Sequence, residues 1–295
     1  MSLAARLGLP DDARIVVGHQ DDIGMCHGAN MAFADLNGKG VITCASVMVP
    51  CPWFLEVADM AAAQPELDIG IHLTLTAERD HYRWRPLLGT SPATGLVDGD
   101  GYMWRSAKEV REHADPEAVE DELRLQVAAA KRAGIAATHL DCHMGTAMAP
   151  EFVDIYLRLG EELDLPVLYT RFWNGDAAKA ANAREQAVME ESVRRLEARR
   201  NPIFEEAIET PWIPHEGHRA VYEAIVDRIP PGLTFLSLHP NRPGDIEAID
   251  PAKCHCRTDE WRLFQDEAFA ARIRDRGIHL IGFREVRAAM AQGAA

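Results

Sequence analysis

Short apolar, β-branched runs recur along the chain with helical patterns between them, and this alternation constrains the fold most. It is typical of repeated βα units, which build a parallel sheet. The seven predicted strands are Ile15–Gly18, Val41–Val49, Leu67–Leu75, Ala137–Asp141, Pro166–Thr170, Leu233–Leu238 and Ile278–Gly282. The predicted helices are Gly28–Leu36, Trp53–Ala63, Pro116–Ala133, Glu151–Leu163, Glu216–Asp227 and Glu260–Arg276. Since an α/β barrel commonly occupies about this length, we expect one domain over residues 1–295.

Two segments interrupt the alternation of predicted strands and helices, and we expect insertions near 78–106 and 174–200. Glu78–Ser106 contains Gly, Pro and the turn-like sequence Asp98-Gly99-Asp100-Gly101, which predicts a long loop. Ala178–Arg200 is a charged, alanine-rich helical stretch. It either packs across a face or forms part of a partner contact.

Charge and composition exclude several classes of protein. The formal net charge of −15 disfavours nucleic acid as a partner, since phosphate binding needs clustered Lys and Arg. No stretch approaches the roughly 18 to 20 apolar residues of a membrane span. Met1–Leu9 lacks the pattern of a secretory signal, and the six cysteines are scattered, so we expect a cytoplasmic protein with reduced thiols. A neutral small molecule is the expected partner.

Aspartates and histidines, which can bind metals and transfer protons, lie at or just after the ends of four predicted strands. Asp21 and Asp22 follow the first, His72 lies late in the third, and His143 and His239 follow the fourth and the sixth. In a parallel α/β protein the loops after the carboxyl ends of the strands converge on one face. A paired aspartate and histidines at that face are what a divalent metal with a neighbouring base requires.

His139 leaves an alternative open, because strand alternation puts His139, Asp141 and His143 on the same face. Either histidine could be a ligand. The position at the strand end favours His143, with Asp141 or His139 as the partner that fixes a ligand's tautomer.

Several blocks, in this order and spacing, resemble the YdjC/ChbG-like carbohydrate deacetylases, which are related in mechanism to the NodB-type polysaccharide deacetylases. The resemblance extends over nearly the whole chain. Its blocks are Asp21–Gly24, Asn30, Gly40–Val49, Gly70–Thr76, Thr138–His143, His239-Pro240, and Arg257 with Glu260.

The resemblance implies a distorted (β/α) barrel in which Asp22, His72 and His143 bind one divalent metal, Asp21 is the catalytic base and His239 is the acid. The metal lowers the pKa of a water and stabilises the oxyanion, Asp21 takes the water's proton, and His239 protonates the departing amine. Zinc or magnesium is the first expectation, with manganese, cobalt or nickel as alternatives. The resemblance also implies a homodimer.

We therefore expect a metal-dependent hydrolase that removes the acetyl group from a small N-acetylated sugar. Two alternatives stay open. One is a metal-assisted hydrolase of a non-sugar amide or ester, and the other is a non-catalytic barrel that binds a metal or ligand. Asp21 and His239 argue against the second alternative, since metal binding alone needs neither.

The chain departs from the family pattern at the rim. The family usually has Asn-Ala before the two aspartates, where this chain has His19-Gln20. Met144-Gly145-Thr146 stands where the family usually carries further histidines, and His239-Pro240-Asn241-Arg242-Pro243-Gly244 replaces a His-Pro-Gly motif. These changes spare the expected ligands and base, but they alter the region where sugar selectivity would reside.

Overall fold

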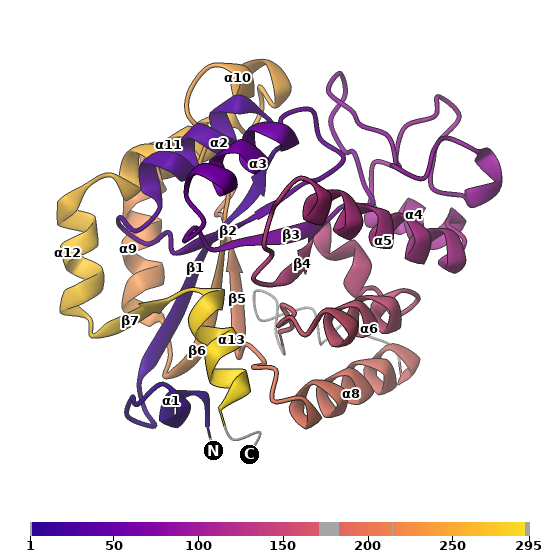
Figure 1. The fold of residues 1–295 in the computed structure, drawn as a ribbon. Helices are drawn as coiled ribbons and strands as arrows, with labels where there is room; N and C mark the ends of the chain where they lie inside the picture. Colours follow the sequence, from indigo (N-terminus) through magenta and orange to yellow (C-terminus); the bar gives the residue numbers. More distant parts are fainter. Residues whose placement is uncertain (1, 171–182, 214, 293–295) are drawn as a thin grey trace.

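A seven-stranded parallel sheet, curled into a half-barrel and surrounded by helices, forms the centre of the molecule (Figure 1). The computed structural model describes residues 2–170, 183–213 and 215–292. The strands are β1 (Arg14–Ile23), β2 (Cys44–Val47), β3 (Ile69–Leu73), β4 (Leu140–Cys142), β5 (Glu206–Glu209), β6 (Gly232–Leu238) and β7 (Ile278–Ile281). The prediction of a distorted, barrel-like α/β fold is confirmed.

Strand β1 is the axis of the sheet, whose order is β4-β3-β2-β1-β6-β5. It pairs with β6 along Arg14–Gln20. It also pairs with β7 along Arg14–Val17 and with β2 from His19 onward, so two short strands follow each other along β1. The row of paired strands ends at β4 on one side and at β5 on the other.

Helices cover the outside of the curled sheet (Figure 1). They are α1 (Leu3–Arg6), α2 (His27–Leu36), α3 (Phe54–Ala63), α4 (Ala107–His113), α5 (Pro116–Arg132), α6 (Val153–Leu163), α8 (Ala183–Ala198), α9 (His218–Arg228), α10 (Asp245–Ile249), α11 (Cys254–Phe264), α12 (Glu267–Asp275) and α13 (Phe283–Ala291). Short 3-10 turns are η1 (Pro92–Thr94), η2 (His143–Met148) and η3 (His215–Gly217). Helices α1 and α13 lie together, where Arg6 Nη1 donates to the carbonyl of Ala289 at 3.1 Å.

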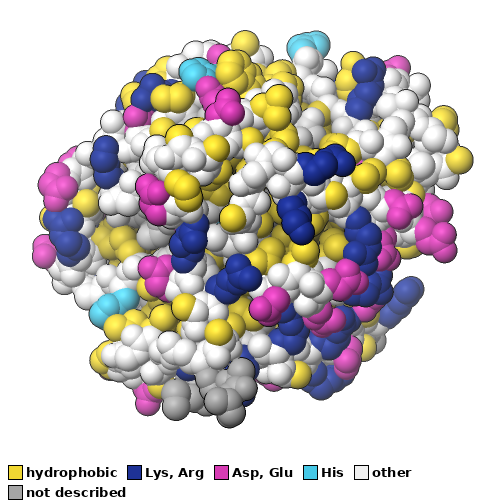
Figure 2. Space-filling model, viewed as in Figure 1, with side chains coloured by type: hydrophobic (Ala, Val, Ile, Leu, Met, Phe, Trp, Pro, Cys, Tyr) yellow, Lys and Arg dark blue, Asp and Glu magenta, His cyan; other side chains and the backbone are white. Residues whose placement is uncertain are grey.

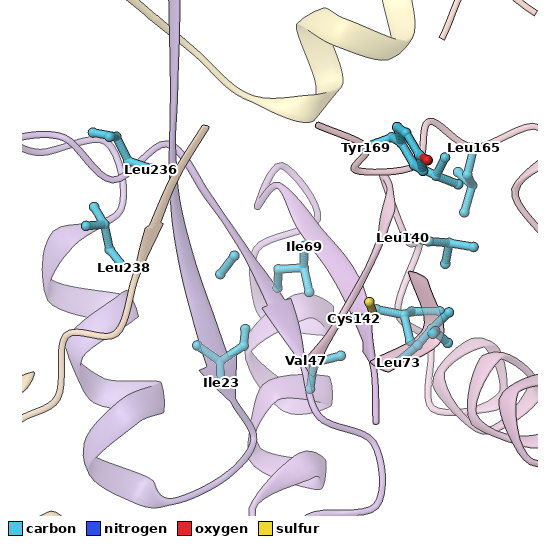
Figure 3. Packing of buried hydrophobic residues seen from close by; sticks show 14 of the residues in the cluster. Ile23, Val47, Ile69, Leu73, Leu140, Cys142, Leu165, Tyr169, Leu236 and Leu238 are labelled. Atoms are coloured by element: carbon cyan, nitrogen blue, oxygen red, sulfur yellow. The ribbon is translucent and has the colours of Figure 1, made fainter. Parts of the chain in front are cut away.

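Apolar side chains from successive strands hold the sheet against these helices (Figure 3). Ile23, Val47 and Leu73 come from β1, β2 and β3, and all three are fully buried. Burial of each such side chain contributes roughly 1.5–3 kcal/mol. Because these residues lie at or near the carboxyl ends of their strands, they support the strand ends on which the polar residues sit.

The predicted strand at Pro166–Thr170 is wrong. Its residues form only isolated bridges, including one between Val167 and Leu140 and one between Thr170 and Phe204. The side chain of Asn201 accepts from the Val167 N–H at 2.8 Å and donates to its carbonyl at 3.0 Å, so a side chain occupies groups that a strand would use. The strand next to β6 is instead β5, which was not predicted.

Other boundaries differ from the predictions. The helix predicted at Glu260–Arg276 is two helices, α11 and α12, because Asp266 caps the second by accepting from the Ala268 N–H at 2.8 Å. Segment 78–106 contains η1 as its one helical turn. Within the predicted helical stretch 178–200, α8 begins at Ala183, and residues 178–182 lie outside the described part of the chain.

Acidic and basic side chains alternate on the face formed by α5, α6 and α8 (Figure 2). Arg124 pairs with Glu162 at 2.6 Å and Arg195 pairs with Asp154 at 2.5 Å, which links the three helices. Exposed pairs of this kind are screened by water and contribute little to stability. Within the described residues, every helix is too short or too polar to cross a lipid bilayer.

Candidate metal centre and active site

A bulge in β1 brings two consecutive carboxylates to one cavity. Strand alternation would point Asp21 and Asp22 to opposite faces of the sheet. The register between β1 and β2 shifts between Gln20 and Ile23, and Asp22 has a φ of 65°. Aspartate tolerates this left-handed conformation better than most residues, and a bulge re-aims the side chain. Both carboxylates therefore line the same cavity.

Asp22, His72 and His143 form a compact group, whose ligand atoms lie within 4.8 Å of one another. Asp22 Oδ1 is 3.5 Å from His72 Nε2 and 3.2 Å from His143 Nδ1. This oxygen is buried and has no hydrogen bond of acceptable geometry among the described residues. One orphaned carboxylate oxygen between two imidazole nitrogens fits a divalent cation.

Asp141 and Ser46 fix the orientation of His72. Strand register places Asp141 on β4 directly opposite His72 on β3. His72 Nδ1 lies 3.0 Å from Asp141 Oδ1 and 2.9 Å from Ser46 Oγ. A hydrogen on Nδ1 leaves Nε2 with a lone pair directed toward Asp22, which is the tautomer that a metal ligand needs.

Glu78 plays the same part for His143. His143 begins η2, directly after β4, and its Nε2 donates to Glu78 Oε2 at 3.0 Å. Burial by itself lowers the pKa of His143, but the charges of Glu78 and Asp22 outweigh it and raise this pKa to about 10. Burial raises the pKa of Glu78, but the charge and hydrogen bond of His143 together with the charge of Arg79 outweigh burial and lower this pKa to about 2. Glu78 is therefore an ionised carboxylate that binds Nε2 of His143. This contact turns the other ring nitrogen, Nδ1, toward Asp22.

The second oxygen of Asp22 accepts a charged hydrogen bond from α11. Arg257 Nη1 donates to Asp22 Oδ2 at 2.9 Å, and both side chains are buried. Burial alone would raise the pKa of Asp22, but Arg257 and the neighbouring His143 hold it well below its usual range. Arg257 thus keeps Asp22 ionised, with Oδ1 left toward the two histidines.

Asp21 is held through both of its carboxylate oxygens. His19 Nδ1 lies 2.6 Å from Asp21 Oδ1, and the Ser237 hydroxyl donates to Oδ2 at 2.7 Å. His239 Nε2 lies 3.9 Å from the same Oδ2. The two residues expected to move protons therefore lie next to each other at one wall of the cavity.

His239 follows β6 and is fixed from two sides. Its Nδ1 is 2.7 Å from Thr210 Oγ1, and its backbone N–H donates to Glu260 Oε2 at 2.6 Å. Burial lowers the pKa of His239 to about 4 in spite of the nearby Asp22. The ring is therefore neutral at pH 7, and its Nε2 is directed toward Asp21.

The cavity in front of these groups has a volume of about 810 Å³. Small-molecule sites commonly span about 300–1,000 Å³. The indole of Trp212 lies on its wall, with its ring centroid 5.2 Å from that of His239. His139 does not line the cavity, since it is fully buried behind it. Of the two histidines left open by the sequence, the structure brings His143 to Asp22.

A family model described as YdjC-like protein matches residues 15–275. The chain belongs to the YdjC-like family. The predicted resemblance is confirmed by this match.

Several curated relatives of this YdjC-like chain are named carbohydrate deacetylase. One from Thermus thermophilus is 37% identical over 161 residues, which cover 55% of each chain. Another from Enterococcus faecalis is 23% identical over 269 residues, which cover 90% of this chain and 95% of the relative. The match thus spans about half the length of the Thermus relative and nearly all of the Enterococcus one.

A solved structure from Enterococcus faecalis, whose name refers to cellobiose-phosphate cleavage, shares the fold. It superposes with a TM-score of 0.72 at 21% identity and covers 92% of this chain and 98% of the other. At this identity the likeness supports the barrel-like fold alone.

Sequence reasoning missed several contributors to the site, Glu78 and Thr210 among them. Glu78 comes from the irregular segment after β3, 65 residues before His143 in the chain. Thr210 follows the unpredicted strand β5. Arg257 and Glu260 were named only as part of the family resemblance, with no role. Only the packing of distant segments shows what these residues touch.

Proposed function

We propose that this chain is a metal-dependent deacetylase that hydrolyses the acetamide group of a small N-acetylated sugar. The observation that carries the proposal is the orphaned Asp22 Oδ1 between His72 and His143, next to the clamped carboxylate of Asp21. Relatives named carbohydrate deacetylase support the choice of substrate class.

Asp22, His72 and His143 are the residues that would hold one divalent cation. A carboxylate with two imidazoles suits zinc and can also hold magnesium, manganese, cobalt or nickel. When bound, the cation supplies Lewis-acid chemistry, in which it lowers the pKa of water and polarises the amide carbonyl.

The protein's own residues handle the protons. Water attacks the acetyl carbon, and Asp21 takes the proton that the water gives up, since the Asp21 carboxylate is held rigid by His19 and Ser237. The C–N bond then breaks, and the leaving nitrogen needs a proton. His239 is neutral at rest and lies 3.9 Å from Asp21, so it takes from Asp21 the proton that came from the water and gives it to the leaving nitrogen. The products are acetate and a free amine.

The cavity agrees with a substrate of one or two sugar rings. Its volume of about 810 Å³ accommodates a small saccharide, and the indole of Trp212 offers an apolar face beside His239. Charged residues of both signs line it, Glu78 and Arg79 among them, which suits a neutral sugar. The homodimer and the cytoplasmic location stay predictions.

An acetate-release screen tests the proposal. The purified protein, loaded separately with zinc, magnesium, manganese, cobalt or nickel, is incubated with N-acetylated mono- and disaccharides, and acetate and free amine are measured together. We expect equal amounts of both products from at least one sugar. Acetate from non-sugar amides or esters but from no sugar would favour the other hydrolase. Metal binding without any turnover would favour a binding barrel.

A further inference from the structure

Behind Asp21, a row of buried polar side chains runs through the core away from the cavity. His19 Nδ1 lies 2.6 Å from Asp21 Oδ1, and His19 Nε2 lies 2.9 Å from His139 Nε2. On the far side, His139 Nδ1 lies 2.9 Å from Thr138 Oγ1. The Thr138 hydroxyl in turn contacts Asp68 Oδ1. Five polar groups are thus linked in series from the rim into the core.

The core is shaped to accept these two imidazoles. His19 and His139 are both fully buried. Phe283 stacks on His139 with ring centroids 3.8 Å apart, and Phe235 lies against His19 at 5.0 Å. Gly70 faces His139 so closely that a methyl group there would overlap the ring. Burial of polar rings lowers stability unless each nitrogen finds a partner, and apolar residues would fill this space at no such cost.

The carboxylate partner of His19 Nδ1 defines where the hydrogen of this contact lies. Asp21 Oδ1 is a carboxylate oxygen, so His19 Nδ1 must supply the hydrogen of that contact. His19 Nε2 and His139 Nε2 share one hydrogen, and His139 Nδ1 and Thr138 Oγ1 share another. Burial lowers the pKa of His139 well below its usual range, which keeps this ring neutral with a single hydrogen. Burial also raises the pKa of Asp68, whose Oδ1 accepts a hydrogen bond from the Thr138 hydroxyl.

We propose that His19 is a positioning residue, whose Nδ1–H fixes the orientation of the Asp21 carboxylate, and that His139 holds the His19 ring in place through the contact between the two Nε2 atoms. With Ser237 on the other oxygen, the carboxylate cannot rotate away from the cavity. This inference rests on the proposed role of Asp21 as the base. The orientation of the Asp21 carboxylate then depends on His19 and His139, which lie in the core behind the cavity.

Two amide substitutions separate this role from simple filling of space. The side-chain nitrogen of His19→Asn falls where Nδ1 lies and can still donate to Asp21, whereas that of His19→Gln falls near Nε2 and cannot. Loss of a supporting hydrogen bond typically costs about 10- to 100-fold in activity. We expect His19→Gln to lower kcat by this factor with KM and bound metal unchanged, and His19→Asn to recover most of the loss. His81→Gln, at an exposed histidine, is the matched control.

A purely structural role predicts the opposite order, because glutamine fills more of the histidine's volume than asparagine. Equal or better activity of His19→Gln would therefore overturn the inference. So would a second metal bound per chain and lost in His19→Asn, since His19, His139 and Asp141 also form a group with metal-ligand spacing.

A spectroscopic measurement decides the point even if no sugar is deacetylated. In ¹⁵N–¹H spectra of histidine side chains in the zinc-loaded protein, we expect a slowly exchanging hydrogen on His19 Nδ1, assigned by its absence in His19→Asn. A His19 ring whose Nδ1 carries no hydrogen would contradict the inference. A wild-type protein that releases no acetate but shows this Nδ1 hydrogen would disprove the proposed function alone.

Discussion

Asp21 and Asp22 are neighbours on one strand, yet their carboxylates face the same cavity and make different contacts. Asp22 is bound by Arg257 on one oxygen and leaves the other toward two histidines, whereas Asp21 is clamped by His19 and Ser237. The left-handed φ of 65° at Asp22 makes this possible. The proposed metal ligand and the proposed base thus come from adjacent positions, which fixes the distance between them within the strand itself.

The three proposed ligands should each be required for metal binding. We expect Asp22→Ala, His72→Ala and His143→Ala to lose most bound metal while the far-UV circular dichroism stays unchanged, because the apolar core does not depend on one rim residue. Metal content is measured by mass spectrometry after dialysis. If His143→Ala kept its metal and His139→Ala lost it, the choice between these two histidines would be wrong.

Glu78 should strengthen metal binding through His143. The neutral amide of Glu78→Gln can still accept from His143 Nε2 but no longer supplies a charge, so we expect metal affinity to fall about tenfold, within the range of about 10- to 100-fold for such partners. Competition with a chromogenic chelator measures the Kd. Glu66→Gln, at an exposed position before β3, is the control. Equal affinities of the two variants would show that Glu78 does not act on the site.

His239 should matter most where the leaving group needs a proton. We expect His239→Ala to slow cleavage of an N-acetyl amide much more than cleavage of an activated acetyl ester, whose leaving group departs unprotonated. The readout is the ratio of the two losses in kcat/KM. Equal slowing would mean that His239 stabilises the oxyanion or positions the substrate.

Glu260 should give the folding stability a specific pH dependence. Burial raises the pKa of Glu260 to about 7, above the value of about 4.3 for an unfolded glutamate. The folded state therefore holds this proton more tightly, so the contribution is complete below about pH 4.3 and is lost as the pH rises through 7.

The variant Glu260→Gln stays neutral at every pH and can keep both contacts, with the His239 N–H and with the hydroxyl of Tyr222. We expect the free energy of unfolding to fall between pH 5 and pH 8 by more in the wild type than in this variant, with a difference on the order of 1–3 kcal/mol. The Tm of the wild type should therefore fall more steeply over this pH range. Parallel curves of Tm against pH would show that Glu260 is ionised throughout.

The sequence predicted the parallel architecture and the rim because apolar runs and the polar residues after them are local signals. It placed the end of β1 at Gly18, although the strand continues to Ile23. The polar residues from His19 to Asp22 lack the apolar pattern of a buried strand. They extend β1 because their polar side chains find buried partners in the folded protein. Strand β5 was missed for a similar reason, since Glu206 and Glu209 at its ends suggest a loop.

The contacts around the ligands could not be predicted, because they join residues that are far apart in the chain. Glu78 reaches His143 across 65 residues, and Arg257 reaches Asp22 across 235. Neither Glu78 nor Arg257 belongs to a local pattern that marks it as functional. The buried link between His19 and His139 spans 120 residues and depends on the space left by Gly70.

The most direct test of the account compares the wild type with Asp21→Asn at equal metal content. The amide keeps the shape of the carboxylate but cannot take a proton, so we expect the variant to bind metal normally and to release acetate from the best N-acetylated sugar slower by a factor on the order of 10²–10⁴. Acetate is quantified enzymatically, with the free amine as a second count. Release of acetate at the wild-type rate by fully metal-loaded Asp21→Asn would contradict the account.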